Sequence, residues 1–388
     1  MRKRAPLDIF ASSAPGLERI VAEEIQQLGI TGAKQIEGGV IFTSDLTRLY
    51  EANLHLRAAS RVVVRVAEFH ASSFHELERR AKRIPWDQYL RPGARSSFRV
   101  TCRKSRLYHS DAVAERFADA VAQKVEGAAF SPAANAPADD VDDPPADEAP
   151  SQLFIVRLAH DNCVVSVDSS GALLHRRGYR QAAGKAPLRE TLAAAMVIGS
   201  GWDLSSPLVD PMCGSGTIVI EAALMARRIA PGMSRAFAFQ EWPGYDSGAW
   251  EAVQSRAQDQ VSSSSMGVLM ASDRDDGVVK SAQENAALAG VGNDIDFQVR
   301  PISAIEPPVG PGWMITNPPY GFRVGERRPL RNLYAQLGKV LRSRTKGYTI
   351  VLLSADSMLE SMLQIDLEEI FRTKNGGIPV RLMKGLAV

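Results

Sequence analysis

The sequence predicts an α/β protein whose C-terminal half is a doubly wound parallel sheet and whose N-terminal half is α+β. Over residues 187–388, short apolar strands alternate with helices, which is typical of a parallel sheet covered by helices on both faces. Residues 8–69 follow a β-α-β-β-α-β order, the pattern of a ferredoxin-like unit. A further set of strands and helices follows over residues 70–168. We therefore predict three domains, at 1–69, 70–168 and 169–388.

The first unit is predicted from helical and alternating apolar spacing and from a hairpin signal at Gly38-Gly39. Its expected elements are a strand over Asp8–Ser12, a helix from Leu17 to Leu28, two short strands flanking the glycines, a helix over Leu46–Leu56 and a strand over Val62–Val66.

The second unit is predicted to contain helices and strands on both sides of a basic segment, Arg103–Asp111. Within this segment, Ser110 is a candidate N-cap for the helix that follows. Residues 131–150 are rich in Ala, Pro and Asp and cannot bury a core, so we expect a disordered insertion. The expected elements are helices over Phe74–Arg83 and along the Val113–Val125 stripe, and strands over Ser97–Cys102, Leu153–Leu158 and Cys163–Ser169.

The third unit should hold seven strands, the last two joined through Asn375-Gly-Gly377 as an antiparallel hairpin at the sheet edge. The expected strands are Leu208–Asp210, Val268–Ser272, Ile295–Val299, Trp313–Thr316, Tyr348–Leu353, Glu369–Thr373 and Pro379–Met383. The expected helices are Leu188–Ile198, Thr217–Arg228, Asp276–Ala289 and Leu330–Leu341. Trp242 and Trp250, between the first two strands, are interpreted as core or lid residues.

The net charge of +2 conceals an uneven distribution along the chain. Residues 1–130 carry 21 Lys and Arg against 15 Asp and Glu, whereas residues 131–150 carry six acids and no base. A basic N-terminal third is what a phosphate-binding surface requires, although an ordinary solvated surface remains an alternative.

Composition excludes several classes of protein. No apolar run approaches the roughly 18 residues of a membrane span, and no apolar segment follows the basic start, so we expect neither a membrane anchor nor a signal peptide. Cys102, Cys163 and Cys213 are too few and too widely spaced for a disulfide framework or a CxxC metal site. We expect a cytoplasmic protein without a metal.

The first chemical motif, Asp210–Thr217, lies between an apolar strand and a helix. It is not a Walker loop, because no Gly-Lys follows, and Val219 stands where GxGxxG requires a third glycine. Small residues here let the backbone approach a nucleotide-like ligand, although a tight structural turn would use them too. The candidate cofactor-binding residues are Asp210, Pro211, Met212, Cys213, Gly214, Ser215, Gly216 and Thr217.

Asp273 ends the second strand, with Arg274 beside it. An acid at this position commonly accepts hydrogen bonds from ribose hydroxyls, and the alternative is an N-cap for the next helix. Because Asp275 or Asp276 could cap the helix instead, we assign Asp273 and Arg274 to the cofactor.

The most specific motif is Asn317-Pro-Pro-Tyr320, which follows the fourth strand. Pro318 and Pro319 lack N–H groups and fix the backbone, so their carbonyls are available as acceptors. The Asn317 side chain offers another acceptor and Tyr320 a flat ring. This set suits an exocyclic amine on a base, although a Pro-Pro turn can also simply end a strand.

These motifs resemble motifs I and IV of the class I S-adenosylmethionine-dependent amino-methyltransferases. More narrowly, the chain is similar to the THUMP-containing guanine-N2 RNA methyltransferases, through segments spread over nearly its whole length. The segments are Arg103–Asp111, Leu173-Leu-His-Arg-Arg-Gly-Tyr-Arg180, Pro187-Leu-Arg-Glu-Thr191, Ile220-Glu-Ala-Ala223, Ala230-Pro-Gly232 and Asn375-Gly-Gly377. At two positions the chain departs from the pattern: Pro301 replaces an acid after the third strand, and Phe322 replaces a glutamate after the Pro-Pro motif.

The resemblance implies a Rossmann-like class I methyltransferase domain behind ferredoxin-like and THUMP domains, with S-adenosylmethionine as cofactor and RNA as partner. It implies catalysis by Asn317, Pro318, Pro319 and Tyr320, with Asn317 also touching the cofactor. It further implies RNA binding by Arg103, Lys104, Arg106, Tyr108 and His109.

The expected reaction is methylation of the N2 amine of one guanine, with 23S rRNA as the expected substrate and tRNA as an alternative. Other amine acceptors, namely adenine N6, cytosine N4 or a glutamine amide, remain alternatives, because the Asn317–Tyr320 motif alone does not separate them. A non-catalytic RNA-binding or assembly factor is a second alternative, favoured by Pro301 and opposed by the two intact motifs.

Overall fold

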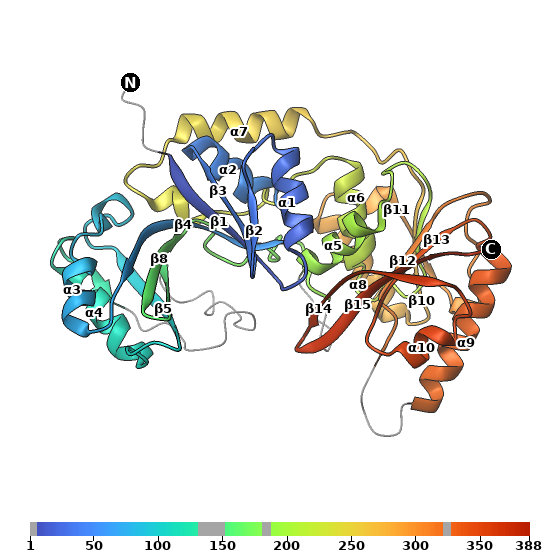
Figure 1. Cartoon of the computed structure of the whole chain (residues 1–388). Helices are drawn as coiled ribbons and strands as arrows, with labels where there is room; N and C mark the ends of the chain where they lie inside the picture. The colour runs from blue at the N-terminus through green and yellow to red at the C-terminus, as the bar shows by residue number, and fades with distance from the viewer. Residues whose placement is uncertain (1–5, 131–151, 181–187, 321–326) are drawn as a thin grey trace.

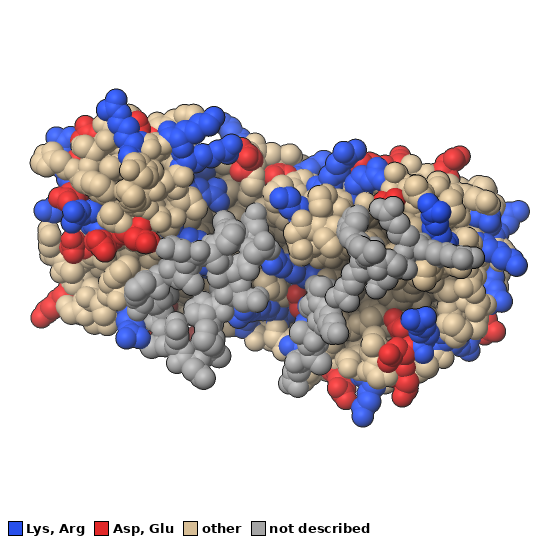
Figure 2. Space-filling model, turned by 90° about the horizontal axis from the view of Figure 1, so that it is seen from below, with Lys and Arg blue, Asp and Glu red and all other residues tan. Residues whose placement is uncertain are grey.

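The computed structural model describes residues 6–130, 152–180, 188–320 and 327–388, so the predicted acidic insertion and Phe322 lie outside the described residues. The molecule is elongated and carries one sheet in each half (Figure 1). Figure 2 shows the same two-lobed outline from below. In the described ranges, no helix combines the length and the apolar character needed to cross a bilayer.

The N-terminal half is built on one continuous sheet with the strand order β2-β3-β1-β4-β8-β7-β5-β6. The first four strands have the order of a ferredoxin-like unit, and β4 extends it by pairing antiparallel with β8 from Val63 to His70. The two N-terminal units therefore share a sheet. Its strands are β1 (Leu7–Ser13), β2 (Lys34–Ile36), β3 (Gly39–Ser44), β4 (Ala59–His70), β5 (Arg95–Arg103), β6 (Ala129–Phe130), β7 (Gln152–Ala159) and β8 (Asn162–Asp168).

Helices of the N-terminal half begin where the sequence provides caps. The Asp45 side chain accepts from the Arg48 amide, and that of Ser73 from the Glu76 amide. Ser110 is not an N-cap as predicted, because it is the first helical residue and His109 precedes it without a side-chain cap bond. The helices are α1 (Glu18–Gln27), α2 (Leu46–His55), α3 (Phe74–Ala81), α4 (Ser110–Ala122) and the short turn η1 (Trp86–Gln88).

The C-terminal half confirms the doubly wound sheet, with the strand order β11-β10-β9-β12-β13-β15-β14. The strands β9 to β13 are parallel to one another, and β15 runs antiparallel between β13 and β14, as the predicted edge hairpin requires. The strands are β9 (Leu208–Asp210), β10 (Leu269–Asp273), β11 (Ile295–Val299), β12 (Trp313–Thr316), β13 (Thr349–Ser354), β14 (Leu367–Asn375) and β15 (Ile378–Leu386).

Two α-helices of this half were not predicted from the sequence, α7 and α10. The α-helices are α5 (Glu190–Ser200), α6 (Thr217–Ala226), α7 (Ser247–Asp259), α8 (Asp276–Leu288), α9 (Arg327–Arg344) and α10 (Ser357–Ser361). Short turns occur at η2 (Ala238–Glu241), η3 (Gly292–Asp294) and η4 (Ile302–Ala304).

The segment that carries α7 joins the two halves of the molecule. The Trp250 ring lies edge-on to Tyr50 of α2, with centroids 5.8 Å apart, and Phe239 stacks on Tyr50 at 4.4 Å. Trp250 and Trp242 are both buried, which agrees with the core interpretation. The aromatic packing gives the two halves a shared apolar core.

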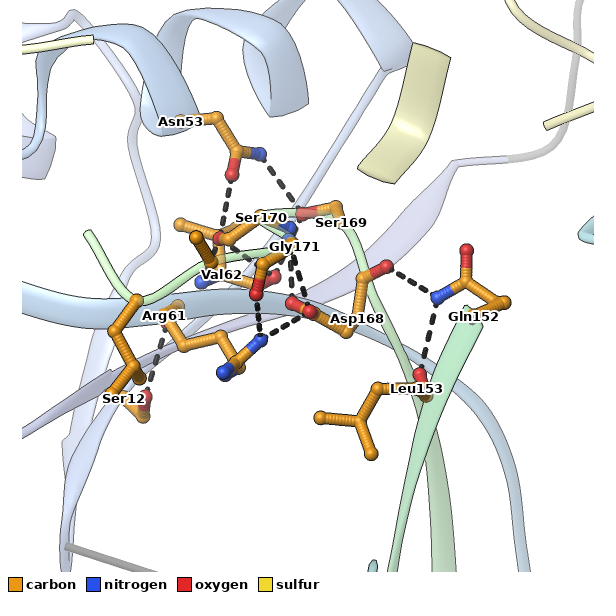
Figure 3. Close-up of polar contacts among 12 residues, drawn as sticks. Ser12, Asn53, Arg61, Val62, Gln152, Leu153, Asp168, Ser169, Ser170 and Gly171 are labelled. Atoms are coloured by element: carbon orange, nitrogen blue, oxygen red, sulfur yellow. Dashed lines mark hydrogen bonds and ion pairs between the residues drawn. The ribbon is translucent and has the colours of Figure 1, made fainter. Parts of the chain in front are cut away.

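A buried polar network fixes the connection that leaves β8 (Figure 3). Arg61 of β4 forms an ion pair with Asp168 at the end of β8. The Asn53 amide of α2 donates to the Ser169 hydroxyl at 2.9 Å and accepts from the Ser170 hydroxyl at 2.7 Å. Because each side chain is buried and partnered, the chain enters the C-terminal half in one fixed direction.

Candidate functional site

Three adjacent parallel strands bring the predicted site residues to one edge of the sheet. Asp210 ends β9, Asp273 ends β10 and Thr316 ends β12, and β9 lies between the other two. In an open parallel sheet, ligands bind outside the carboxyl ends of the strands. The structure thus places both sequence motifs in the position that such a site requires.

The Asp210–Thr217 segment is a turn whose backbone groups are hydrogen-bonded within the protein. The Cys213 amide donates to the Ser272 carbonyl at 3.0 Å, and the Gly216 amide donates to the Cys213 carbonyl at 2.8 Å. The Asn285 side chain of α8 donates to the Ser215 carbonyl at 3.1 Å. Gly214 has a φ of +52°, and a Cβ added there would meet no atom within 4 Å. An open space therefore faces a rigid turn.

Asp273 ties this turn to the neighbouring strand. Its Oδ2 accepts from the Gly214 amide at 3.2 Å, and its Oδ1 accepts from the Asp275 amide at 3.2 Å. The N-cap of α8 is Asp275, whose carboxylate accepts from the Val278 amide at 3.1 Å. Asp273 is consequently not needed as a cap and stays half-buried at the turn, while Arg274 is exposed.

Asp210 is a buried carboxyl at the centre of the site. Burial raises its pKa to about 7, and the nearby Asp273 carboxylate adds to the rise. The Thr316 hydroxyl and the Met212 amide act in the opposite direction. Within the described residues, Asp210 Oδ2 has no hydrogen-bond partner. Pro211 is buried beside it and Met212 is half-buried.

The acceptor motif after β12 contains a polar oxygen that the protein leaves without a donor. Asn317 Oδ1 is buried and has no hydrogen-bond partner in the described part of the chain. Pro318 is buried and Pro319 exposed, and neither can donate an N–H. A buried acceptor without a donor is costly, so it indicates a place where a ligand supplies the hydrogen.

Tyr320 is anchored by a residue far along the sequence. The Asn375 side chain, at the end of β14, donates to the Tyr320 hydroxyl at 2.6 Å. Burial raises the pKa of Tyr320, whereas the Asn375 hydrogen bond lowers it. The sequence pointed to Asn375-Gly-Gly377 as a hairpin turn and as part of the family resemblance, but it gave Asn375 no role in the site.

A second set of residues missed from the sequence supports the helix that follows the glycine turn. The Arg180 guanidinium donates to the Thr217 hydroxyl at 2.7 Å and pairs with Glu190 of α5 at 3.3 Å. The Tyr179 hydroxyl donates to Glu221 of α6 at 3.1 Å. In the sequence, these residues could have been found from the segments that carry the family resemblance, namely Leu173–Arg180, Pro187–Thr191 and Ile220–Ala223.

The basic segment after β5 forms an exposed loop in the N-terminal half. Arg103, Lys104, Arg106, Tyr108 and His109 are all exposed, and the Tyr108 and His109 rings lie 4.1 Å apart. The loop is tied to the β7–β8 turn, because the Arg106 amide donates to Asp161 Oδ1 at 2.7 Å. The structure thus separates these residues from the glycine turn and the acceptor motif, in a different sheet.

The described residues favour neither a metal site nor a cysteine nucleophile here. Among the described residues, no group of three or more His, Cys, Asp or Glu is arranged to hold a metal ion. Burial and the Asp210 and Asp273 carboxylates raise the pKa of Cys213, which disfavours the thiolate that a nucleophile needs. Pro301 is exposed at the start of η4, after β11.

Comparison with known families identifies the C-terminal half. The family description "RMKL-like, methyltransferase domain" matches residues 177–384, more than half of the chain. The chain belongs to this methyltransferase family. Within the N-terminal half, an "RlmL ferredoxin-like domain" matches residues 8–63 and a "THUMP domain" matches residues 71–168. The fold class expected from the resemblance is thereby confirmed.

Whole-length relatives agree with this family. "Putative RNA methyltransferase slr0064" of Synechocystis sp. (strain ATCC 27184 / PCC 6803 / Kazusa) is 35% identical over 376 residues, which cover 97% of this chain and 95% of the relative. The SMU.472 protein, solved in complex with SAH, is 28% identical with a TM-score of 0.86, and 99% of each chain is covered. A Listeria monocytogenes str. 4b F2365 structure, titled a predicted N6-adenine-specific DNA methylase, is 30% identical with a TM-score of 0.83, and 97% of this chain and 96% of that chain are covered.

Proposed function

We propose that this methyltransferase transfers a methyl group from S-adenosylmethionine to the exocyclic N2 amine of a guanine in RNA, and that 23S rRNA rather than tRNA is the substrate. One observation carries the proposal. The buried Asn317 oxygen has no donor within the described protein, and it lies between a buried strand end and the anchored Tyr320 ring. An exocyclic amine would supply the missing hydrogen.

The cofactor fits the first motif. The open space at Gly214 leaves room for a ligand against the backbone, and the Asp273 carboxylate lies where ribose hydroxyls would donate. The unpartnered Asp210 Oδ2 offers a further acceptor. When bound, S-adenosylmethionine supplies an electrophilic methyl group. We assign Asp210–Thr217, Asp273, Arg274 and Asn317 to its binding.

The acceptor motif would orient the base. The target guanine must leave its stack to reach a site at the end of β12. Tyr320 would stack on it, which contributes ~1–3 kcal/mol at other base-stacking aromatics. Asn317 Oδ1 and the Pro318 carbonyl would accept the two amine hydrogens and direct the nitrogen lone pair, while Pro319 keeps the backbone fixed. Catalysis then rests on positioning and on stabilising positive charge at nitrogen.

RNA as the substrate follows from the N-terminal half. The exposed loop with Arg103, Lys104, Arg106, Tyr108 and His109 combines cations for phosphates with rings for bases. The relative from Synechocystis carries RNA in its name, and the THUMP match spans this loop.

Adenine N6 is the second candidate acceptor, because it too presents two amine hydrogens and the Listeria relative is titled for it. The methylated nucleoside that forms distinguishes guanine N2 from adenine N6 as the acceptor. Purified protein should be incubated with methyl-labelled S-adenosylmethionine and total RNA from a strain that lacks the gene, and the RNA digested to nucleosides. We expect label in N2-methylguanosine from 23S rRNA. Label in N6-methyladenosine would replace the guanine assignment, and absence of label in any RNA would refute the proposed function.

A further inference from the structure

The helix that follows the acceptor motif has an unusual charge. From Arg327 to Lys346 the chain carries seven Lys and Arg and no acid, and the next acid is Asp356. Each of the other α-helices in the described residues contains at least one Asp or Glu. Surface helices normally mix both signs, so α9 stands apart.

The packing of α9 places its charges on one side. Its apolar residues Tyr334, Leu337, Val340 and Leu341 are buried in a core shared with β12, β13 and β15. Arg331, Lys339 and Arg344 lie on the exposed side, and Lys346 follows at the end of the helix. The helix itself therefore turns cations and no acid of its own to solvent, although the Glu306 carboxylate lies near Arg344.

Some of these cations have a structural role, and others do not. Arg342 donates to the Leu363 carbonyl, and Arg344 donates to the Ile305 carbonyl at 2.7 Å. Both also lie in the last turn, where a cation stabilises a helix. Lys339 and Lys346 are exposed and form no ion pair with any described residue. Their charge remains available to a partner.

The position of α9 relates it to the acceptor motif. The helix begins seven residues after Tyr320, and it lies at the end of the molecule opposite to α3 and α4 (Figure 1). Figure 2 shows Lys and Arg side chains gathered at that same end. The basic loop at Arg103–His109 belongs to the other half, so the two positive surfaces lie far apart along the molecule.

We propose that the exposed face of α9, centred on Lys339 and Lys346, binds phosphates of the RNA substrate as a second docking surface. The inference rests on the proposed function and adds to it a contact from the methyltransferase domain itself. Lysine ammonium groups without carboxylate partners release counterions when they meet phosphates, so their contribution depends on salt.

The test compares two charge-matched variants of the full chain. Lys339→Gln/Lys346→Gln removes two cations from this face, and Lys34→Gln/Lys280→Gln removes two exposed cations from β2 and α8. The probe is a fluorescein-labelled oligouridylate of 30 nucleotides, titrated by anisotropy at several KCl concentrations. Because all four lysines are exposed, both variants should melt like the parent protein.

For single strands, each lost phosphate contact lowers the slope of log K against log salt by about 0.7. The α9 variant should therefore show a slope shallower by about 1.4, whereas the control variant keeps the parent slope. Equal slopes for both variants would overturn the proposal. If the α9 variant bound RNA like the parent protein but no longer bound phosphatidylserine vesicles that the parent binds, the proposal would be overturned in favour of a membrane surface. Failure of the proposed function is separate, because it appears as absence of methyl transfer by the parent protein.

Discussion

The glycine turn after β9 and the acceptor motif after β12 lie at neighbouring strand ends but differ in how their polar groups are satisfied. In the turn, the amides of Cys213, Gly214 and Gly216 all donate to protein oxygens. In the acceptor motif, the Asn317 Oδ1 oxygen is buried without a donor in the described residues. The protein thus pairs the backbone of the turn by itself, but it leaves the side-chain oxygens Asp210 Oδ2 and Asn317 Oδ1 without a donor in the described residues.

This difference separates two tasks. A turn whose backbone is already paired keeps its shape when no ligand is bound, so it can offer a preformed surface to a cofactor. Acceptors without donors carry a desolvation cost that an incoming amine would remove. We therefore expect changes in the turn to affect cofactor affinity and changes in the acceptor motif to affect the transfer rate.

Asn317→Ala should give the largest effect. It removes the unpartnered acceptor and leaves the glycine turn unchanged. The transfer rate should fall by roughly 10²-fold or more, as for other contacts that act in the transition state. Single-turnover methylation of unmodified RNA measures this loss, and calorimetry should show a much smaller change in S-adenosylmethionine affinity than in the rate. Full activity would rule out the proposed role of Asn317.

Gly214→Val should weaken cofactor binding by at least about tenfold. The left-handed φ of +52° costs a branched residue ~1–3 kcal/mol, and its side chain would enter the open space. Gly290→Val is the matched control, because its φ is +73° and its added Cβ also meets open space, but it lies after α8. Equilibrium dialysis with labelled cofactor should separate the two variants. Equal affinities would place the cofactor elsewhere.

The buried Asp210 carboxyl should make stability depend on pH. Its pKa of about 7 in the folded chain lies above the ordinary value of 3.8, so between these values the folded chain holds a proton that the unfolded chain releases. The free energy of unfolding should therefore decrease from pH 4 to pH 7, by about 1 kcal/mol per pH unit from this group. Asp210→Asn should remove that decrease in urea titrations.

Asp203 should affect the pH dependence of the free energy of unfolding in the opposite direction. Hydrogen bonds from Ser205 and Ser206 lower its pKa to about 2, despite the opposing effect of desolvation, so its contribution to stability is lost as the pH falls below about 4. Asp203→Asn should leave the slope between pH 5 and pH 7 unchanged. A parent slope that survives in Asp210→Asn would contradict the assignment to Asp210.

The Asn375–Tyr320 hydrogen bond should give the smallest effect. Tyr320→Phe keeps the ring that stacks but loses the anchor, and Asn375→Leu loses the donor. Each variant should slow transfer a few-fold, and the double variant should be no slower than either one, because both remove the same contact. Additive losses would show that the two residues act independently.

The sequence predicted the parts of the site that are local in the chain. Asp210–Thr217 and Asn317–Tyr320 each combine a strand end with residues whose backbone chemistry is distinctive, so their positions at the sheet edge could be predicted. Strands such as β9, β11 and β12 begin and end at the predicted residues, because apolar runs bounded by Gly, Pro and Asp define them.

Contacts between distant segments could not be predicted in the same way. Asn375 is 55 residues from Tyr320, and Tyr179 is 42 residues from Glu221, so no spacing pattern pairs them. The helix α7 was missed because only Trp250, Val253 and Ala257 of its residues are buried. The continuous N-terminal sheet depends on β4–β8 pairing across about 100 residues, which local patterns do not encode.

The most direct test of the amine assignment uses the substrate itself. After the methylated position is mapped, an RNA fragment that spans it can be made with inosine in place of the target guanine, which removes only the N2 amine. We predict that the protein binds this RNA with an affinity within a few-fold of that for the parent RNA, and that this RNA accepts no methyl group. Methylation of the inosine RNA at the parental rate would contradict the assignment of the guanine N2 amine as the acceptor.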